Sequence, residues 1–304
     1  MNSLKERKKS QLLRGLEILN GRSTLSADSS SYYRALVSGF EGECLFDQTV
    51  KETVTSEGLV LNDLLLSVNG TTMQIDSLIL TPDLIYLFEV KHYKGDYTCG
   101  VDYYRKNNGY DVLNPKIQLS KSLTLLSQLF KQWRIGTPLK GAVVFTHPTF
   151  MLYGAEQDEQ IIFPSQLSHY LKQVNSQGNM ISHQSRSLAN HLIEHHRDEV
   201  PYQKQLPAYK WDTLKKGLTC GICKSFDLRL TQRTSRCNAC QRTISRQDCL
   251  LENIQDLRLL YPDEKLTSSL VYDWIGGSVY KRSITSLLDA TYIKTGYARG
   301  RYYR

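Results

Sequence analysis

The sequence predicts an α/β protein followed by a small cysteine-containing module and a helical C-terminal part. Two alternating apolar tracts, residues 72–80 and 84–91, predict a β-hairpin, because residues two apart in a strand share a face. Helical and strand-like stretches follow the hairpin as far as residue 173. Two Cys-x2-Cys pairs then occur between Cys220 and Cys240, and helical patterns follow them.

Two helices are predicted before the hairpin. Residues 1–29 begin with a basic stretch and are interpreted as an N-terminal basic helix. Further along, Ser38 and Glu41 have the spacing of a capping box, which predicts that a second helix begins there. Glu43 then lies in the early turns of this helix, where the helix dipole alone favours an acid.

The chain after the hairpin predicts three strands or hairpins and three helices. The turn residues Asn107-Asn108-Gly109 indicate a short hairpin within residues 102–112. Asn114-Pro115 introduces a helix whose apolar residues continue to Phe130. The remaining segments are a buried strand over 139–146, a strand over 161–163, a helix over 165–173 and a last helix within 175–209.

Charged and polar side chains inside the first hairpin need a physical explanation. Gln74 and Asp76 share a face of the first strand, and Glu89 and Lys91 share a face of the second. A buried charge is costly unless it is paired or bound to a metal. Carboxylates are ligands that Mg²⁺ prefers, and a nearby lysine can orient or deprotonate a metal-bound water. An ion pair of Lys91 with Glu89 or Asp76 at a sheet edge fits the same spacing, so both interpretations stay open.

Several short motifs occur in a fixed order between residues 30 and 150. They are Gly39, Gly42 and Glu43, then Gln74-Ile75-Asp76, then Glu89-Val90-Lys91 with Lys94-Gly95, and finally Asn114-Pro115 with Gln118. In these motifs the chain resembles the nuclease-related domain, a branch of the PD-(D/E)XK nuclease superfamily. The resemblance covers less than half of the chain.

The resemblance implies a helix packed on a mixed sheet, with flanking helices and a metal site at the ends of two neighbouring strands. It implies that Asp76 and Glu89 ligate Mg²⁺ or Mn²⁺ directly and that Glu43 reaches the ion directly or through water. Lys91 would assist the attacking water, and Gln74 and Gln118 would be supporting polar groups. For Gln118, an exposed helical position is the competing interpretation.

Four of the seven cysteines predict a structural zinc site. Cys220-x2-Cys223 and Cys237-x2-Cys240 are separated by thirteen residues, which is long enough for a small strand pair. Four thiolates leave no open coordination position, so the site is structural, and it resembles a zinc ribbon. Cys44, Cys99 and Cys249 are interpreted as small buried residues.

The last part of the chain predicts a module that contacts nucleic acid. Two helical stretches around Gly276-Gly277 suggest a helix-turn-helix or a winged helix. The tail carries Lys294, Arg299, Arg301 and Arg304 among tyrosines and has no acid, which suits nucleic-acid contacts, while a packing strand is the alternative.

The charge is unevenly distributed along the chain. Residues 207–304 contain 17 Lys plus Arg against 9 Asp plus Glu, a net charge of +8, which is the net charge of all 304 residues. Four parts are therefore predicted: an N-terminal basic helix over 1–29, a nuclease-related domain over 30–206, a zinc ribbon over 207–249 and a nucleic-acid-binding module over 250–304. With no long apolar run and no signal-peptide core, no membrane contact and a cytoplasmic location are expected.

The expected function is that of a metal-dependent DNA endonuclease or DNA-processing phosphodiesterase. Two alternatives remain: a non-catalytic DNA-binding protein with an inactive nuclease-like scaffold, and a nuclease directed at RNA. DNA is the expected partner, and the sequence names no protein partner.

Overall fold

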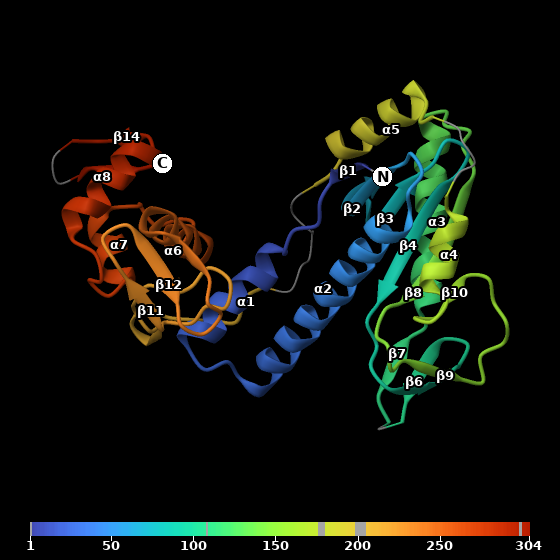
Figure 1. The fold of residues 1–304 in the computed structure, drawn as a ribbon, viewed down its shortest axis with the longest axis horizontal. Helices are drawn as coiled ribbons and strands as arrows, with labels where there is room; N and C mark the ends of the chain where they lie inside the picture. Colours follow the sequence, from blue (N-terminus) through green and yellow to red (C-terminus); the bar gives the residue numbers. More distant parts are fainter. Residues whose placement is uncertain (1, 108, 176–179, 198–204, 298–299) are drawn as a thin grey trace. The chain divides into compact units, whose positions relative to one another are not determined.

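The structure, a computed structural model, describes residues 2–107, 109–175, 180–197, 205–297 and 300–304 (Figure 1). The chain divides into two compact units, each considered by itself. The N-terminal unit comprises residues 1–8 and 35–203, and the C-terminal unit comprises residues 9–34 and 204–304. Within the described residues, no helix has both the length and the apolar character that a membrane span requires.

A six-stranded mixed sheet forms the centre of the N-terminal unit, in the order β1-β2-β3-β4-β8-β10. β2, β3 and β4 are antiparallel neighbours, whereas β1 pairs parallel with β2, and β8 pairs parallel with both β4 and β10. The strands are β1 (Asn2–Lys5), β2 (Leu59–Val68), β3 (Thr71–Leu80), β4 (Ile85–Lys91), β8 (Leu139–Phe145) and β10 (Ile161–Ile162). The predicted hairpin is therefore confirmed as β3 and β4, while β1 and β2 were not predicted.

Helices cover both faces of this sheet. Apolar side chains of α2 (Ala27–Thr53) and α4 (Leu167–Gln173) pack on one face, in a cluster that includes Phe46, Phe88 and Leu171. α3 (Pro115–Gln132) and α5 (His183–Glu194) contribute to the cluster on the other face. The result is a helix–sheet–helix arrangement with two separate apolar cores.

A small four-stranded sheet, in the order β7-β6-β5-β9, adjoins the second of these cores. Its strands are β5 (Asp96–Thr98), β6 (Tyr103–Lys106), β7 (Asp111–Leu113) and β9 (Met151–Tyr153). The antiparallel pair β6 and β7 confirms the hairpin predicted within residues 102–112. Asn114 then caps α3, accepting a hydrogen bond from the backbone N–H of Lys116 at 3.0 Å, and Pro115 occupies the first turn.

The structure differs from two helix predictions near the N-terminus. Residues 1–29 do not form one basic helix: β1 pairs with β2, and α1 (Gln11–Arg22) starts only after Ser10, whose hydroxyl caps it. Ser38 does not open a helix either, because α2 already begins at Ala27, where the Ser26 hydroxyl accepts the N–H of Ser29. Glu43 therefore lies well inside α2.

The C-terminal unit joins a small antiparallel sheet to four helices and a terminal strand pair. The sheet consists of β11 (Leu228–Leu230), β12 (Thr234–Cys237) and β13 (Thr243–Ser245), with η1 (Trp211–Thr213) before it. The helices are α1, α6 (Arg246–Leu260), α7 (Ser268–Trp274) and α8 (Lys281–Thr291), and β14 (Lys294–Thr295) pairs with β15 (Tyr302–Tyr303). One apolar core contains residues from all four helices together with Tyr303 of β15.

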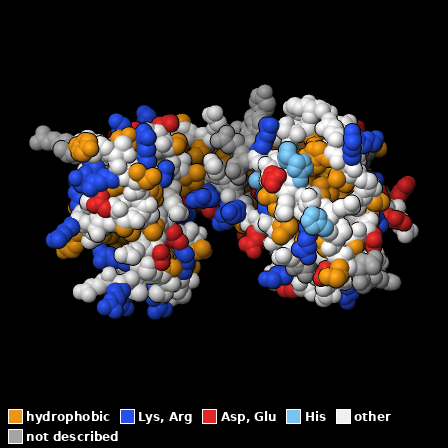
Figure 2. All heavy atoms as spheres, turned by 90° about the horizontal axis from the view of Figure 1, so that it is seen from above, with side chains coloured by type: hydrophobic (Ala, Val, Ile, Leu, Met, Phe, Trp, Pro, Cys, Tyr) orange, Lys and Arg blue, Asp and Glu red, His pale blue; other side chains and the backbone are white. Residues whose placement is uncertain are grey.

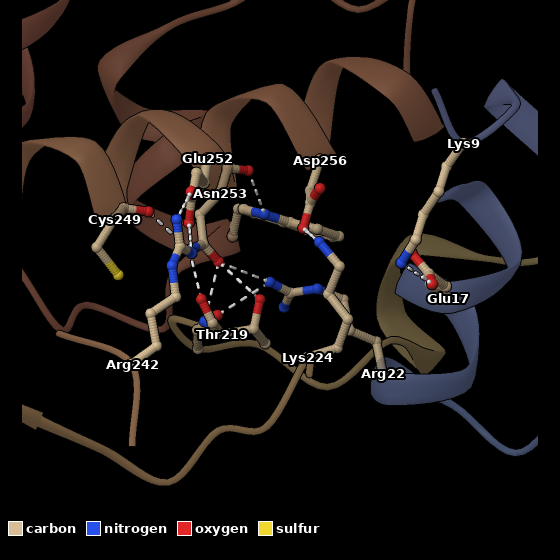
Figure 3. A network of polar contacts seen from close by, with 12 residues as sticks. Lys9, Glu17, Arg22, Thr219, Lys224, Arg242, Cys249, Glu252, Asn253 and Asp256 are labelled. Atoms are coloured by element: carbon tan, nitrogen blue, oxygen red, sulfur yellow. Dashed lines mark hydrogen bonds and ion pairs between the residues drawn. The ribbon is translucent and has the colours of Figure 1, made fainter. Parts of the chain in front are cut away.

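A buried polar network stabilises the C-terminal unit around Arg22 of α1 (Figure 3). The Arg22 guanidinium donates to the carbonyl oxygens of Lys215 and Gly217 and to the side chain of Asn253, and it lies 3.7 Å from the Trp274 ring. Asn253 also accepts the backbone N–H of Thr219. Because unpaired buried polar groups are costly, this network fixes α1 against α6 and the cysteine-containing segment.

Candidate active site and metal centre

The predicted catalytic acids lie where the pairing of β3 with β4 ends. The last paired residues are Ser77 and Phe88, so the next step of the register opposes Asp76 to Glu89. The Asp76 carboxylate instead accepts the backbone N–H of Val90 at 2.8 Å. Asp76 is 7% exposed and Glu89 is 1% exposed, so two acids lie buried at one end of the sheet.

The alternation of side chains shifts at this point. Leu78 and Leu80 of β3 belong to the apolar core on the α3 side, and so do Met73 and Ile75. Residues on one face of a regular strand are an even number apart, but Ile75 and Leu78 are three apart. The strand therefore changes its alternation between them, at Asp76 and Ser77. β2 makes the same change beside Asp63, whose φ of 53° is unusual for a residue with a side chain.

Lys91 connects Glu89 to α3. Its ammonium donates to Glu89 Oε1 at 2.6 Å and to Gln118 Oε1 at 3.1 Å. The ion pair between Glu89 and Lys91, one of the two interpretations that the spacing left open, is therefore present. Gln118 is exposed, as its competing interpretation has it, and it also contacts Lys91.

Arg7 is a residue of this site that the sequence did not reveal. Its side chain is 3% exposed and makes a two-point contact with Asp47, at 2.9 and 3.1 Å. It also donates to Glu43 Oε2 at 2.7 Å and to the backbone carbonyl of Asp76 at 2.6 Å. One buried guanidinium therefore joins α2 to β3. No motif in the sequence marks Arg7. Because β1 was not predicted, nothing in the sequence placed Arg7 beside the sheet.

Burial and mutual repulsion raise the pKa values of the acids. Burial, helped by the neighbouring charge of Asp76, raises the pKa of Glu89 to about 8. The same two causes raise the pKa of Glu43 to about 7, although Arg7 opposes the shift. Burial also raises the pKa of Asp76, while Lys91 and the hydrogen bond from Val90 oppose it. A bound cation would relieve each of these unfavourable charges.

The donor set fits a hard divalent cation. Glu89 Oε2 is buried and has no hydrogen-bond partner, although a buried carboxylate oxygen is ordinarily satisfied. Glu43, Asp76 and Glu89 offer the carboxylate oxygens that Mg²⁺ or Mn²⁺ accepts. Among the described residues, however, these acids do not converge as closely as the four cysteines do.

Gln74 lies at the margin of this group. It is exposed, and its amide donates to Asp63 Oδ1 at 3.1 Å. Asp63 in turn raises the pKa values of Asp76, Glu43 and Asp47 through its charge. Asp63 and Asp47 are thus two further acids that were not predicted from the sequence. For Asp63, the polar pair Asn62-Asp63 inside an apolar run was the available signal.

Gly42 explains how α2 approaches the sheet. A Cβ at this position would lie 2.3 Å from the Cβ of His92, so only glycine allows this contact. His92 follows Lys91, and its ring nitrogen lies 2.8 Å from the Thr146 hydroxyl. This contact agrees with the structural role that its position on the opposite face from Lys91 suggests.

The four cysteines of the C-terminal unit form a compact cluster on the small sheet. Their sulfurs all lie within 4.8 Å of one another, with separations of 3.6 Å for Cys220–Cys240 and 3.5 Å for Cys223–Cys237. Ligands about 2.3 Å from a tetrahedral zinc lie ~3.8 Å apart, so the cluster is consistent with structural zinc. The predicted strand pair between the knuckles is confirmed as β11 and β12.

The two knuckles repeat the same backbone geometry. The backbone N–H of Lys224 donates to the carbonyl oxygen of Cys220, and the backbone N–H of Gln241 donates to the carbonyl oxygen of Cys237, each at 3.0 Å. Lys224 and Gln241 both have positive φ, 54° and 62°. This conformation is costly for residues with a side chain, and its repetition supports two matched metal-binding turns.

The three remaining cysteines differ in their burial. Cys249 is buried, as predicted, and belongs to the core of the C-terminal unit, whereas Cys99 is half-buried. The prediction was wrong for Cys44, which is exposed on α2.

Two of the four basic residues of the tail, Lys294 and Arg304, have partners within the chain. Lys294 lies 3.5 Å from the Asp289 carboxylate, and the Arg304 guanidinium lies 5.4 Å from the Tyr302 ring. Arg301 has a buried Nε without a hydrogen-bond partner. Arg299 lies outside the described residues.

Comparison with known proteins identifies one segment of the chain. A family model described as nuclease-related domain matches residues 38–146. No curated protein and no solved structure matches the chain. The matched segment contains Glu43, Asp76, Glu89 and Lys91, whereas Arg7 and the cysteine cluster lie outside it. Residues 38–146 are therefore a nuclease-related domain, which implies a nuclease-related function for this chain.

Proposed function

We propose that this protein is a metal-dependent DNA nuclease. In this proposal Asp76 and Glu89 ligate Mg²⁺ or Mn²⁺, and Glu43 contributes directly or through water. The observation that supports it most strongly is the buried Glu89 carboxylate, which has one unsatisfied oxygen and a pKa raised to about 8 beside a second buried acid. Such a pair of acids is unfavourable unless a cation compensates it.

The proposed reaction is hydrolysis of a phosphodiester. The water oxygen bonds to phosphorus and one ester bond breaks, so the products are a phosphate monoester and a hydroxyl, and one water is consumed. A divalent cation in such a site supplies Lewis acidity and lowers the pKa of bound water. The protein contributes the placement of the carboxylates and of Lys91.

Lys91 has the properties of a cationic hydrogen-bond donor. Burial lowers its pKa, but the charges of Glu89 and Asp76 outweigh this effect and raise the pKa above its ordinary value. An ammonium cannot accept a proton, so Lys91 would orient the water or stabilise charge on the phosphate. Coordination of both acids would weaken the two charges that raise its pKa, which would make proton transfer easier.

The basic C-terminal unit is the proposed nucleic-acid-holding part. Its net charge exceeds that of the nuclease-related part, and Lys and Arg side chains are scattered over the face drawn in Figure 2. In this proposal the cysteine cluster holds structural zinc, and α7 and α8 form a helix-turn-helix or winged helix with β14 and β15. The core would have a PD-(D/E)XK-type fold.

A cleavage assay tests the proposed activity. The purified full chain should cut plasmid or linear DNA with Mg²⁺ or Mn²⁺ and should not cut it with EDTA. Asp76→Ala and Lys91→Ala should each lower the rate by about 100-fold or more. Lys121→Ala, at an exposed position of α3, is the matched control and should retain activity. Activity that survives the double variant Asp76→Ala/Lys91→Ala would refute the assignment.

One observation favours a second candidate, a DNA-binding protein with an inactive nuclease-like scaffold. Lys91 already pairs with Glu89, and Arg7 already pairs with Glu43, so part of the acidic charge is compensated within the chain. Binding without cleavage, over several DNA and RNA substrates and both metals, would favour this candidate. Competition between matched DNA and RNA probes at one salt concentration would show which nucleic acid is the target.

A further inference from the structure

A groove of about 850 Å³ lies on the C-terminal unit, outside the tail and the nuclease site. It is lined by the turn between β11 and β12, by the start of α6 and by one side of α8. Three arginines line it: Arg233 from the turn, Arg246 from α6 and Arg282 from α8. The backbone N–H of Arg246 donates to the carbonyl of Arg233 at 2.8 Å, which holds the first two elements together.

Among the described residues, no ion pair, side-chain hydrogen bond or ring contact involves the side chains of Arg233, Arg246 and Arg282. Elsewhere Arg242 pairs with Glu252 at 2.7 Å and Lys224 with Asp256 at 2.7 Å. Within the part of the chain that the structure describes, no carboxylate or aromatic ring contacts the guanidinium of Arg233, Arg246 or Arg282.

The groove is therefore strongly positive. Among the described residues that line it, Asp248 is the one acid, and its carboxylate already accepts a hydrogen bond from the Ser245 hydroxyl at 2.7 Å. The hydroxyls of Ser283 and Ser286 add neutral donors beside Arg282. Three cations against one carboxylate leave an excess of positive charge in a concave site, which attracts anions.

We propose that this groove, rather than the C-terminal tail, binds the phosphate backbone of the substrate DNA. Guanidinium groups match phosphate oxygens with two hydrogen bonds, and serine hydroxyls commonly contact phosphates as well. A groove of about 850 Å³ is larger than a single phosphate requires, so it suits a nucleic-acid strand better than one small anion. The groove is preferred to the tail because the tail residues Lys294 and Arg304 already have intramolecular partners. The choice of DNA as the ligand rests on the proposed nuclease function.

Two matched triple variants test the proposal. Arg233→Gln/Arg246→Gln/Arg282→Gln removes three positive charges from the groove, and Lys294→Gln/Arg301→Gln/Arg304→Gln removes three from the tail. DNA binding of the full chain is measured by fluorescence anisotropy at several salt concentrations, without added Mg²⁺ or Mn²⁺ and without chelator, so that metal-dependent cleavage is suppressed while the bound zinc is retained. Bound zinc and the unfolding midpoint are measured for both variants to verify that each is folded.

The groove variant should lose at least tenfold in affinity, and the slope of log Kd against log[salt] should fall by about 2 to 3 for three lost phosphate contacts. The tail variant should lose less than threefold. Equal losses in both variants, unchanged binding by a folded groove variant, or no DNA binding by the wild type would each overturn the proposal. Equally tight binding of polyglutamate in the groove would overturn it in favour of an acidic protein partner.

The same experiment separates this inference from the proposed nuclease function. If the groove variant binds DNA normally while the wild type cleaves it, only the groove assignment is wrong. If the wild type binds through the groove but never cleaves in Mg²⁺ or Mn²⁺, the groove assignment stands and the catalytic proposal is wrong.

Discussion

Arg7 makes more contacts with the candidate site than any residue predicted for it. Its guanidinium contacts Glu43, Asp47 and the backbone of Asp76 while remaining 3% exposed. Burial lowers its pKa, but these three acids outweigh burial and raise it. The nuclease-related domain covers residues 38–146, and Arg7 lies before it. The candidate site therefore includes a residue from outside the matched domain.

Arg7→Ala should destabilise the protein strongly. Removing one partner of a buried ion pair leaves uncompensated charge, which costs about 3 to 5 kcal/mol. Urea unfolding of the full chain measures the loss, and Arg105→Ala, which breaks an exposed pair with Asp111, is the control that should leave the midpoint unchanged. Arg7→Lys should recover only part of the stability, because an ammonium cannot make the two-point contact with Asp47. A loss below about 1 kcal/mol would contradict the assigned role.

Glu89 should make the stability of the metal-free protein depend on pH. Its pKa rises from 4.5 to about 8 on folding, so between these values the folded state holds more protons than the unfolded state. Stability should therefore be fully present below pH 4.5 and fall as the pH rises through about 8. Glu89→Gln cannot ionise and should reduce this fall.

Thermal unfolding from pH 6 to 9, without added Mg²⁺ or Mn²⁺ and without chelator, measures the effect of Glu89. Glu17→Gln, in the C-terminal unit, serves as the control and should retain the wild-type slope. An identical slope in wild type and Glu89→Gln would mean that Glu89 is already ionised in the folded protein.

At the scale of single elements, local patterns predicted some parts of the fold and missed others. The hairpin β3–β4 was readable because its apolar residues recur over two whole strands, and α3 was readable from its Asn114-Pro115 start. β2 was missed although it is apolar. Asn62 and Asp63 interrupt its apolar run, whereas Asn69-Gly70, the turn that joins it to β3, was the available signal for a strand before β3.

The beginning of α2 shows how a correct local signal can mislead. Ser38 and Glu41 have capping-box spacing, but they lie inside a helix that already continues from Ala27. Serine is tolerated in a helix interior, so the spacing of two residues cannot exclude a longer helix. Placing Glu43 at the site required the packing of α2 against β4, which comes from tertiary structure.

The approach of α2 to β4 predicts opposite effects for two glycines of the same helix. At Gly42 a Cβ would meet the Cβ of His92 at 2.3 Å, so Gly42→Ala should push the helix away and destabilise by about 1 to 3 kcal/mol. At Gly39 a Cβ would meet nothing within 4 Å, so Gly39→Ala should stabilise the helix by about 0.5 to 1 kcal/mol. Urea denaturation compares the two variants, and the expectation fails if both change stability in the same direction.

At the scale of the whole molecule, charge and cysteine spacing were informative and the course of the N-terminal segment was not. The +8 charge of residues 207–304 and the four ligand-spaced cysteines were visible in the sequence. The sequence did not reveal that residues 9–34 belong to the C-terminal unit. Ile18 and Leu19 of α1 belong to the core of that unit, and Arg22 has partners, Lys215, Gly217 and Asn253, that lie about 200 residues away along the chain.

Zinc removal should unfold the C-terminal unit selectively. The two knuckles are held by positive-φ residues, Lys224 and Gln241, and the three strands between and beside them are short. Structural zinc binding commonly contributes about 10 to 16 kcal/mol in small zinc-binding peptides, so such a module depends on its metal. Protein purified without chelator should contain one zinc per chain, and a content well below one would count against the site.

A tryptophan variant makes this unfolding observable in the full chain. Trp133 belongs to the N-terminal unit, whereas Trp211 and Trp274 belong to the C-terminal unit, where Trp274 is fully buried. In a Trp133→Phe background, fluorescence reports the C-terminal unit alone, and chelation or Cys223→Ser should shift the emission to longer wavelength as Trp274 becomes exposed. Cys44→Ser removes an exposed cysteine that is not part of the cluster and should change neither zinc content nor emission. An unchanged emission after complete zinc loss would show that the core around Trp274 and Arg22 folds without the metal.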